Sequence, residues 1–205
     1  DTFKFPGHTD YLNEQLEGDS LMFMVTDSLK VALMSDHIPL KEVVGYLNEE
    51  KINAKIASLE KSLSQDFGIQ RPKIAVLGIN PHTGDNGVIG DEDDTLLTPV
   101  IKKWNEKGSL VFGPYAADGF FGNQRYTKFD GVLATYHDQG LIPFKTLSFG
   151  QGVNFTAGLS HVRTSPDHGT AFDIAGKGVA DASSFSEAVY TARAIFLQRK
   201  EVNFS

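Results

Sequence analysis

Three short apolar runs in this chain are each followed within a few residues by a histidine. His37 follows residues 29–34, His82 follows residues 73–79, and His137 follows residues 132–136. Each run has the length and composition of a buried β-strand. Ligands of an open parallel α/β sheet bind beyond the carboxyl ends of its strands, and we therefore expect the three imidazoles to meet at one sheet edge.

Three imidazoles at one edge are typical of a divalent-metal site. Neutral imidazole suits zinc, iron, cobalt or nickel, and neighbouring carboxylates extend the range to manganese or magnesium. His37, His82 and His137 lie too far apart in the chain for a metal-binding motif on one helix. The site is therefore assembled by the fold or shared between two chains. Asp138 is expected either to orient a ligating histidine or to act as a base; a solvated loop aspartate is the alternative.

Periodicity and turn residues predict the other elements. We expect helices at residues 8–17, 40–48, 54–67, from Asp94 or Thr95 to 107, and 184–197. The last begins with capping-box spacing between Ser184 and Glu187. Strands are expected at 29–34, 73–79, 110–112 and 132–136, a strand–turn–strand unit at 142–157, and loops at 80–87, 113–126 and 163–182. Strands that alternate with helices predict an α/β protein with a largely parallel sheet.

Composition narrows the classes of partner. The net charge is −7 over 205 residues, which disfavours a nucleic-acid surface because phosphate binding needs clustered Lys and Arg. The chain has no cysteine, so disulfides and thiolate metal sites are excluded. No apolar run reaches the length of a membrane span, and no signal-peptide pattern opens the chain. We expect a cytoplasmic protein with no nucleic-acid or membrane partner.

Candidate anion-binding residues follow the third histidine. Lys145, Asn154 and Arg163 are spaced at strand ends and loops, and they supply the charge-assisted and neutral donors that bind phosphate or carboxylate. His8 and Thr9, after a Pro-Gly turn, are expected to add donors; a plain helix cap is the alternative for Thr9. The alternative is that Lys145 and Arg163 are ordinary surface cations.

The chain lacks the usual nucleotide-binding signatures. No GxGxxG sequence opens a helix after a strand, so the Rossmann fingerprint is absent. Gly84, Gly87 and Gly90 have neither that spacing nor a Walker lysine, and they indicate a tight turn rather than a phosphate cradle. His161 has no partner pattern and is interpreted as a structural or surface residue.

Several segments, in order over nearly the whole chain, resemble the 4-hydroxythreonine-4-phosphate dehydrogenase family. They are PGHT (6–9), SDHIPL (35–40), NPHTGDNG (80–87), GPYAAD (113–118), YHDQGLIPFK (136–145), GVNFTAGL (152–159) and RTSPDHGTAFDIAGKG (163–178). The last segment also resembles the nucleotide-binding loop of isopropylmalate and isocitrate dehydrogenases. That superfamily binds NAD or NADP without a Rossmann fingerprint, which explains its absence here.

The resemblance implies a set of site residues. Metal ligands would be His37, His82 and His137, shared between the subunits of a homodimer and holding Zn, Mg, Co or Mn. Substrate contacts would come from His8, Thr9, Lys145, Asn154 and Arg163. By similarity to the superfamily loop, His168 and Asp173 would lie near the adenosine of NAD or NADP.

The reaction implied by the resemblance is an NAD-dependent oxidation of the secondary alcohol of 4-phosphooxy-L-threonine, followed by decarboxylation, in pyridoxal 5'-phosphate biosynthesis. Lys145 or a metal-ordered water is expected to accept the hydroxyl proton. One alternative is a paralogue that oxidises D-threonate or D-erythronate 4-phosphate. Another is a non-catalytic domain that binds metal and phosphate. The superfamily also contains phosphate acyltransferases, in which no histidine trio is expected.

The chain matches only about the last three-fifths of the family's length. The implied fold is an isocitrate/isopropylmalate dehydrogenase-like α/β/α sandwich that lacks the N-terminal part of its first domain. Residues 1–149 would form most of the second domain, with the metal ligands and the dimer interface, and residues 150–205 the C-terminal part of the first, cofactor-binding domain. Because Asp1 rather than methionine opens the sequence, we expect a fragment or a processed chain. Since part of the first domain would be missing, we expect this chain to lack a complete cofactor cleft and to be catalytically poor alone.

Overall fold

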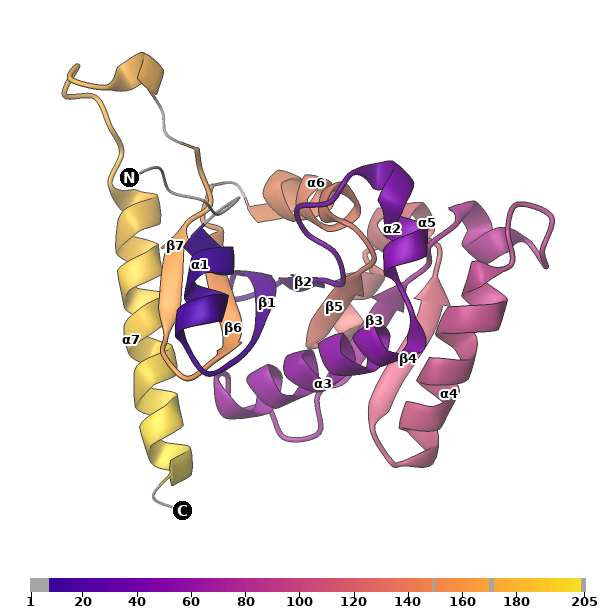
Figure 1. The fold of residues 1–205 in the computed structure, drawn as a ribbon. Coiled ribbons are helices and arrows are strands. Elements are labelled where there is room, and N and C mark those ends of the chain that lie inside the picture. Colours follow the sequence, from indigo (N-terminus) through magenta and orange to yellow (C-terminus); the bar gives the residue numbers. More distant parts are fainter. Residues whose placement is uncertain (1–7, 149, 170–171, 204–205) are drawn as a thin grey trace.

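Seven strands form one mixed sheet in the computed structural model, which describes residues 8–148, 150–169 and 172–203 (Figure 1). The strand order is β4-β3-β5-β2-β1-β6-β7. The strands are β1 Gly18–Val25, β2 Lys30–Leu33, β3 Lys73–Leu77, β4 Leu110–Tyr115, β5 Gly131–Ala134, β6 Val153–Leu159 and β7 Arg163–Pro166.

The sheet has a parallel half and an antiparallel half. β4, β3, β5 and β2 are parallel, with Ala75 opposite Val132 and Leu33 opposite Ala134. β1 is antiparallel to both β2 and β6, and β6 is antiparallel to β7. The prediction of a largely parallel sheet is therefore wrong for β1, β6 and β7. The sequence pattern does not predict β1. The pairing of β1 with β6 joins the two proposed domains in one sheet. The division at residue 149 stays a prediction.

Helices cover both faces of the sheet. They are α1 His8–Gln15, α2 Leu40–Tyr46, α3 Glu49–Gln65, α4 Thr98–Glu106, α5 Ala117–Gly122, α6 His137–Ser148 and α7 Ser183–Asn203. A π-helical turn, Asp93–Leu97, leads into α4, and short 3-10 turns cover Pro81–Gly84, Arg125–Lys128 and Phe172–Ile174. α7 runs along the β7 end of the sheet (Figure 1). Among the described residues, no helix is both long and apolar enough to cross a membrane.

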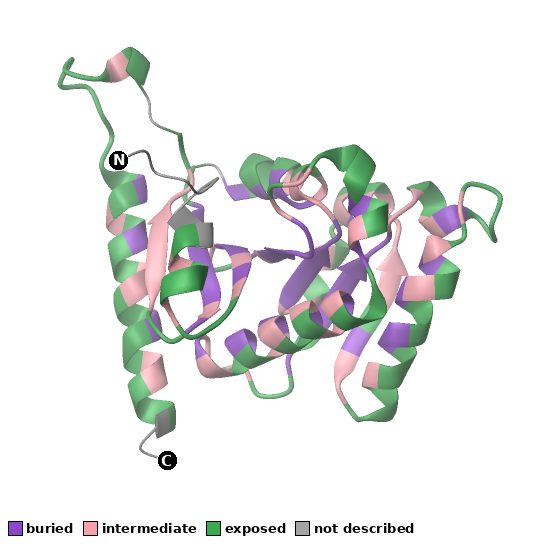
Figure 2. Cartoon of the chain, in the orientation of Figure 1, coloured by how far each residue is buried: buried purple, intermediate pink, exposed green. Residues whose placement is uncertain are grey.

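Two apolar clusters lie on opposite faces of the sheet. One packs α3, α4 and α7 against side chains such as Phe23, Ile74 and Phe155. The other packs α5 and α6 against the alternate side chains, among them Met24 and Leu33. Because successive strand residues point to opposite faces, the same strands serve both clusters. Figure 2 shows the central strands buried and the outer sides of the helices exposed.

An aromatic trio connects the antiparallel strands with the end of α3. The ring centroids of Phe23 and Phe155 lie 6.3 Å apart, and Phe67 meets both rings edge to face at 5.7 and 6.2 Å. Phe23 and Phe155 are fully buried. Offset and edge-to-face geometries are the favourable arrangements of aromatic pairs. The trio therefore stabilises the β1–β6 pairing.

Residues 142–148 are helical, which corrects the prediction of a strand there. They belong to α6, whose residues Leu141 and Phe144 are buried against the sheet. Gly140 allows the close approach, since a Cβ at this position would lie 2.8 Å from Leu33 Cδ2. The apolar composition of this segment is common to strands and buried helices, and tertiary packing decided between them.

Other predicted boundaries also need correction. Residues 113–126 contain the end of β4 and all of α5, and residues 163–166 form β7, so neither region is only a loop. Ser184 is not a helix cap: it lies inside α7, and the side chain of Asp181 accepts the Ser183 N–H at 2.9 Å. The first turn of α7 is thus held by an acidic residue outside the helix.

Replacing Phe155 with alanine is expected to lower the free energy of unfolding by about 3–5 kcal/mol, because a fully buried ring is lost and a cavity is left. Phe172→Ala is the matched control, since Phe172 is 81% exposed. Urea unfolding followed by circular dichroism measures both variants. Equal losses in the two variants would contradict the assignment of Phe155 to the core.

Candidate functional site

Two of the three predicted metal ligands lie together at the carboxyl edge of the parallel strands. His37 follows β2 and His137 is the first residue of α6, directly after β5. Their ring centroids are 6.1 Å apart, and their planes are inclined by 40°. His37 is exposed and His137 is half-buried. The parallel pairing of β2 with β5 thus places two imidazoles side by side.

Asp138 orients one of these rings. Its Oδ1 lies 2.7 Å from Nδ1 of His137. A carboxylate on one ring nitrogen sets the tautomer and leaves Nε2 available as a ligand, as in many metal centres. The orienting role of Asp138 at a metal site stays a prediction.

His82 does not join the pair within this chain. It lies on the 3-10 turn Pro81–Gly84, in the left-handed region at φ 52°, with an exposed side chain. Among the residues that the structure describes, no group of three His, Asp or Glu side chains is close enough to hold a metal ion. Ligation by all three histidines stays a prediction.

A buried carboxylate braces the loop that carries His82. Asp93 is fully buried and accepts the backbone N–H groups of Ile79 at 2.8 Å and Asn80 at 2.9 Å. Asn80 also donates from Nδ2 to Glu92 at 2.7 Å, and this hydrogen bond lowers the pKa of the Glu92 carboxyl. The sequence analysis missed Asp93, because nothing in its spacing distinguishes it from the neighbouring acidic residues.

A cavity of about 670 Å³ opens beside the two histidines, between α6 and the antiparallel strands. Its lining combines imidazoles, carboxylates and a lysine with apolar side chains: Met22, Met24, His37, His137, Asp138, Leu141, Ile142, Lys145, Asn154, Ser165, Pro166, Asp167, His168 and Gly169. Concave sites with an apolar lining and a few convergent polar groups are typical ligand sites. This cavity is the candidate functional site.

Asn154 occupies the floor of the cavity with an unsatisfied acceptor. It lies on β6 between Met24 of β1 and Ser165 of β7. Its Oδ1 is buried and has no hydrogen-bond partner among the residues that the structure describes. A buried acceptor without a partner costs free energy, so such atoms in native proteins often serve a ligand or an ordered water.

Two cations accompany Asn154. Lys145 lines the cavity, and its Nζ donates to the backbone oxygen of Asp167 at 2.7 Å. Arg163 pairs with Thr156, and its Nη1 donates to the Thr156 hydroxyl at 3.2 Å. Since Thr156 and Asn154 are two residues apart on β6, Arg163 lies on the cavity face of the sheet. Burial lowers the pKa of the Arg163 guanidinium, which remains protonated at neutral pH.

The remaining predicted residues are dispersed. His168 lines the cavity and is exposed. Asp173 is exposed on the 3-10 turn Phe172–Ile174, in a segment that projects beyond the sheet (Figure 1). His8 and Thr9 begin α1, and their side chains lie outside the described residues. His161 is exposed and contacts the Ser160 hydroxyl at 3.0 Å, as expected of a surface residue.

A smaller apolar hollow of about 300 Å³ adjoins the other side of the two histidines. Its lining is Asp36, His37, Ile38, Leu40, Val43, Tyr136, His137 and Asp138. Leu40 is 68% exposed at its rim. The histidine pair and Asp138 therefore line both hollows.

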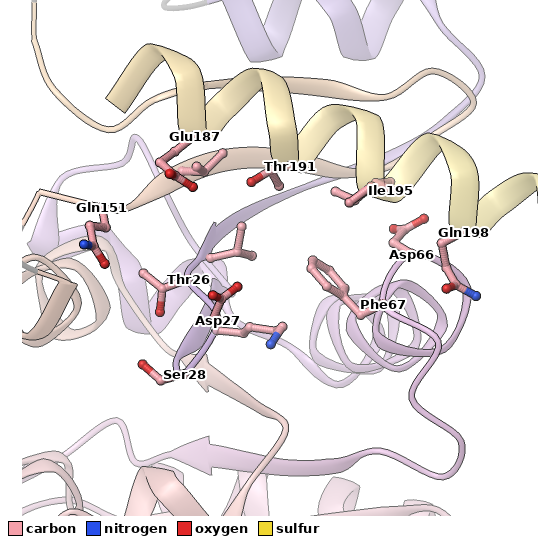
Figure 3. A pocket seen from close by; sticks show the side chains of 14 residues that line it. Thr26, Asp27, Ser28, Asp66, Phe67, Gln151, Glu187, Thr191, Ile195 and Gln198 are labelled. Carbon is pink, nitrogen blue, oxygen red and sulfur yellow. The ribbon is translucent and has the colours of Figure 1, made fainter. Parts of the chain in front are cut away.

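A different pocket, of about 360 Å³, lies between α7 and the β1–β2 turn (Figure 3). Thr26, Asp27 and Ser28 from the turn face Glu187 and Thr191 of α7 across it. It contains none of the predicted site residues and is separate from the histidine pair. We therefore do not assign it a role in the chemistry.

Residues 1–192 match the model of a protein family described as "Pyridoxal phosphate biosynthetic protein PdxA". The chain belongs to this family. Relatives named 4-hydroxythreonine-4-phosphate dehydrogenase include a Bacteroides thetaiotaomicron protein, 51% identical over 97% of this chain and 55% of its own length. A Sulfurihydrogenibium sp. relative of the same name is 48% identical over 96% of this chain and 60% of its own length. The chain thus spans a little over half the length of these relatives.

Solved structures of the PdxA family have the same mixed α/β fold. The 4-hydroxythreonine-4-phosphate dehydrogenase of Klebsiella pneumoniae matches with a TM-score of 0.81 at 41% identity, over 94% of this chain and 59% of that chain. A terephthalate 1,2-cis-dihydrodiol dehydrogenase from Burkholderia xenovorans LB400 matches with a TM-score of 0.74 at 27% identity, over 92% of this chain and 60% of that chain. The fold is therefore shared by dehydrogenases named for different substrates.

Replacing Asn154 with leucine is expected to change the free energy of unfolding by less than about 1 kcal/mol, because Oδ1 has no partner to lose within the described part of the chain. Asn53→Leu is the matched control. Asn53 Oδ1 accepts from Trp104 Nε1 at 2.8 Å, and depriving that donor costs about 1–3 kcal/mol. Urea unfolding measures both. A loss at Asn154 as large as at Asn53 would show that Oδ1 has a partner within the protein.

Proposed function

We propose that this chain carries the metal and substrate site of an NAD(P)-dependent 4-hydroxythreonine-4-phosphate dehydrogenase. The observation that carries the proposal is the composition of one cavity: a histidine pair lies at its edge, and Lys145 and Asn154 line the same space. A cation site beside an anion site suits a phosphorylated hydroxy-amino acid. The names of the family's relatives favour the same reaction in pyridoxal 5'-phosphate biosynthesis.

A divalent metal such as Zn, Co, Mn or Mg fits the donors at the edge of the cavity. His37 and His137 present neighbouring imidazoles, and Asp138 contacts Nδ1 of His137. We assign the third ligand to His82 of a second copy. A metal held by these residues would supply Lewis-acid chemistry, polarising the substrate hydroxyl.

The substrate is held through its anionic groups. Arg163 supplies fixed positive charge for the phosphate or carboxylate. Lys145 lines the same cavity and contacts the substrate as a hydrogen-bond donor. The buried amide of Asn154 gains the partner that it lacks in the free protein when a ligand donor reaches its Oδ1. His8 and Thr9 are proposed to contact the phosphate as well. Held in this way, the reacting hydroxyl faces the histidines.

Proton transfer is assigned to Lys145. Asp138 is engaged with His137, which favours an orienting role for this carboxylate over that of a base. Lys145 reaches into the cavity from α6 and is the remaining candidate for accepting the hydroxyl proton. Oxidation of the alcohol gives a β-keto acid. Loss of CO2 leaves an enolate, and return of the proton held by Lys145 to its carbon gives 3-amino-2-oxopropyl phosphate. Positive charge from Arg163 and from protonated Lys145 stabilises the enolate that forms when CO2 leaves.

NAD or NADP is the proposed hydride acceptor. His168 lines the cavity and Asp173 is exposed nearby in sequence, so both are available to hydroxyl groups of a dinucleotide. We assign residues 150–205 to a cofactor-binding part and residues 1–149 to a metal-binding part. A cytoplasmic location, where both cofactor and substrate are available, completes the proposal.

The proposed partner is a second copy of the chain. Val88 is 80% exposed and Ile89 is 45% exposed, and both lie on the loop that carries His82. The apolar hollow beside His37 and His137 offers a surface of matching character. In a twofold dimer, contact between these two surfaces would bring His82 toward the histidine pair of the other copy.

His82→Ala and the double variant His37→Ala/His137→Ala are each expected to lose bound metal, because each removes ligands from the shared site. A mixture of the two, after subunit exchange, is expected to regain about one quarter of the wild-type metal content. Half of the dimers are then mixed, and each mixed dimer has one complete site. Elemental analysis of the separated protein measures the metal.

His161→Ala is the control and is expected to retain the wild-type metal content, since His161 is on the surface away from the cavity. No recovery in the mixture, with each single variant depleted, would show that the ligands belong to one chain. Full metal content in His82→Ala would remove His82 from the site.

Turnover of 4-phosphooxy-L-threonine, with NADH formation followed by absorbance, is expected from the full-length protein. Lys145→Ala should lower kcat by at least about 100-fold, because a positioned proton acceptor contributes that much or more. Faster turnover of D-threonate or D-erythronate 4-phosphate would assign the substrate to the alternative class. Metal binding without calorimetric binding of NAD or NADP would favour a non-catalytic domain.

A further inference from the structure

One side chain outside the cavity connects the segments that carry all three histidines. Gln139 is the third residue of α6, and both the oxygen and the nitrogen of its carboxamide form hydrogen bonds. Oε1 accepts the backbone N–H of Thr135 at 2.8 Å and the hydroxyl of Thr135 at 2.9 Å. Nε2 donates to the backbone oxygen of Gly78 at 2.7 Å. The amide thus joins the carboxyl ends of β5 and β3.

Gly78 fixes the start of the loop that bears His82. Its N–H donates to the Tyr115 backbone oxygen at 2.8 Å, so its peptide is held from both sides. A Cβ on Gly78 would lie 2.8 Å from Oδ1 of Asp93, the carboxylate that binds the next two N–H groups. The position of this peptide therefore sets the direction in which the loop leaves the sheet.

Thr135 extends the connection to β2. Its backbone oxygen accepts the Ser35 hydroxyl at 2.8 Å, and both side chains are buried. Ser35 lies two residues before His37, as Thr135 lies two residues before His137. A single amide therefore contacts two of the three strand ends directly and reaches the third through Thr135.

We propose that Gln139 is a positioning residue for the metal site, an inference that rests on the proposed function. Its bonds to Thr135 are those of a residue that closes the first turn of a helix, and a glutamate can make them too. Its bond to Gly78 needs an N–H donor, which an ionised glutamate lacks. Gln139→Glu therefore separates helix capping from the connection to the His82 loop.

The experiment measures Co2+ affinity and the visible absorption spectrum of the Co2+ form, together with the thermal midpoint, in the full dimeric protein. Gln139→Glu is expected to weaken Co2+ binding by about 10- to 100-fold, the usual effect of losing an outer support of a metal ligand, and to shift the spectrum. The added negative charge alone would strengthen cation binding. A loss of Co2+ affinity would therefore be attributed to the lost hydrogen bond between Gln139 and Gly78. Gln70→Glu, at an exposed position, controls for charge.

A second readout uses the metal-free protein. Hydrogen exchange of the backbone amides in residues 78–90 is expected to accelerate in Gln139→Glu and to remain unchanged in Gln70→Glu. If Gln139→Glu fails to fold, Gln139→Met, which has a similar length and no charge, is measured in the same way. Wild-type affinity, spectrum and exchange in a folded variant would overturn the role of Gln139. Failure of the wild-type protein to bind Co2+ would instead overturn the proposed metal site.

Discussion

The parallel pairing of β2, β5 and β3 is the constraint on which the site depends. Backbone hydrogen bonds hold these strands in register, with Leu33 beside Ala134 and Val76 beside Leu133. Their carboxyl ends therefore lie along one edge, where segments that are distant in the sequence become neighbours. The closeness of His37 and His137 follows from this pairing rather than from any local motif.

The antiparallel strands give the site its second half. β1, β6 and β7 continue the sheet past the parallel strands, and α6 stands over the junction. The cavity between them is lined by the two imidazoles, Lys145 and the buried amide of Asn154. Residues from both halves of the sheet therefore face one space.

Prediction from sequence was most accurate where one signal dominated. Apolar runs predicted β2, β3 and β5, and helical periodicity predicted α2 and α3, because burial on one face leaves a regular pattern. It failed where the local pattern was ambiguous. Residues 142–148 are predicted as a strand but form part of a helix, and β1, which lies between β2 and β6, is not predicted.

The order of residues alone was sufficient to identify the family, the α/β class and the candidate site residues, since these depend on residue types at given positions. Three-dimensional packing decided which of them meet. His37 and His137 come together, whereas His82 stays apart, because a loop's direction depends on contacts made by residues elsewhere, among them Asp93 and Gln139. Those contacts join residues remote in sequence, and no local pattern encodes them.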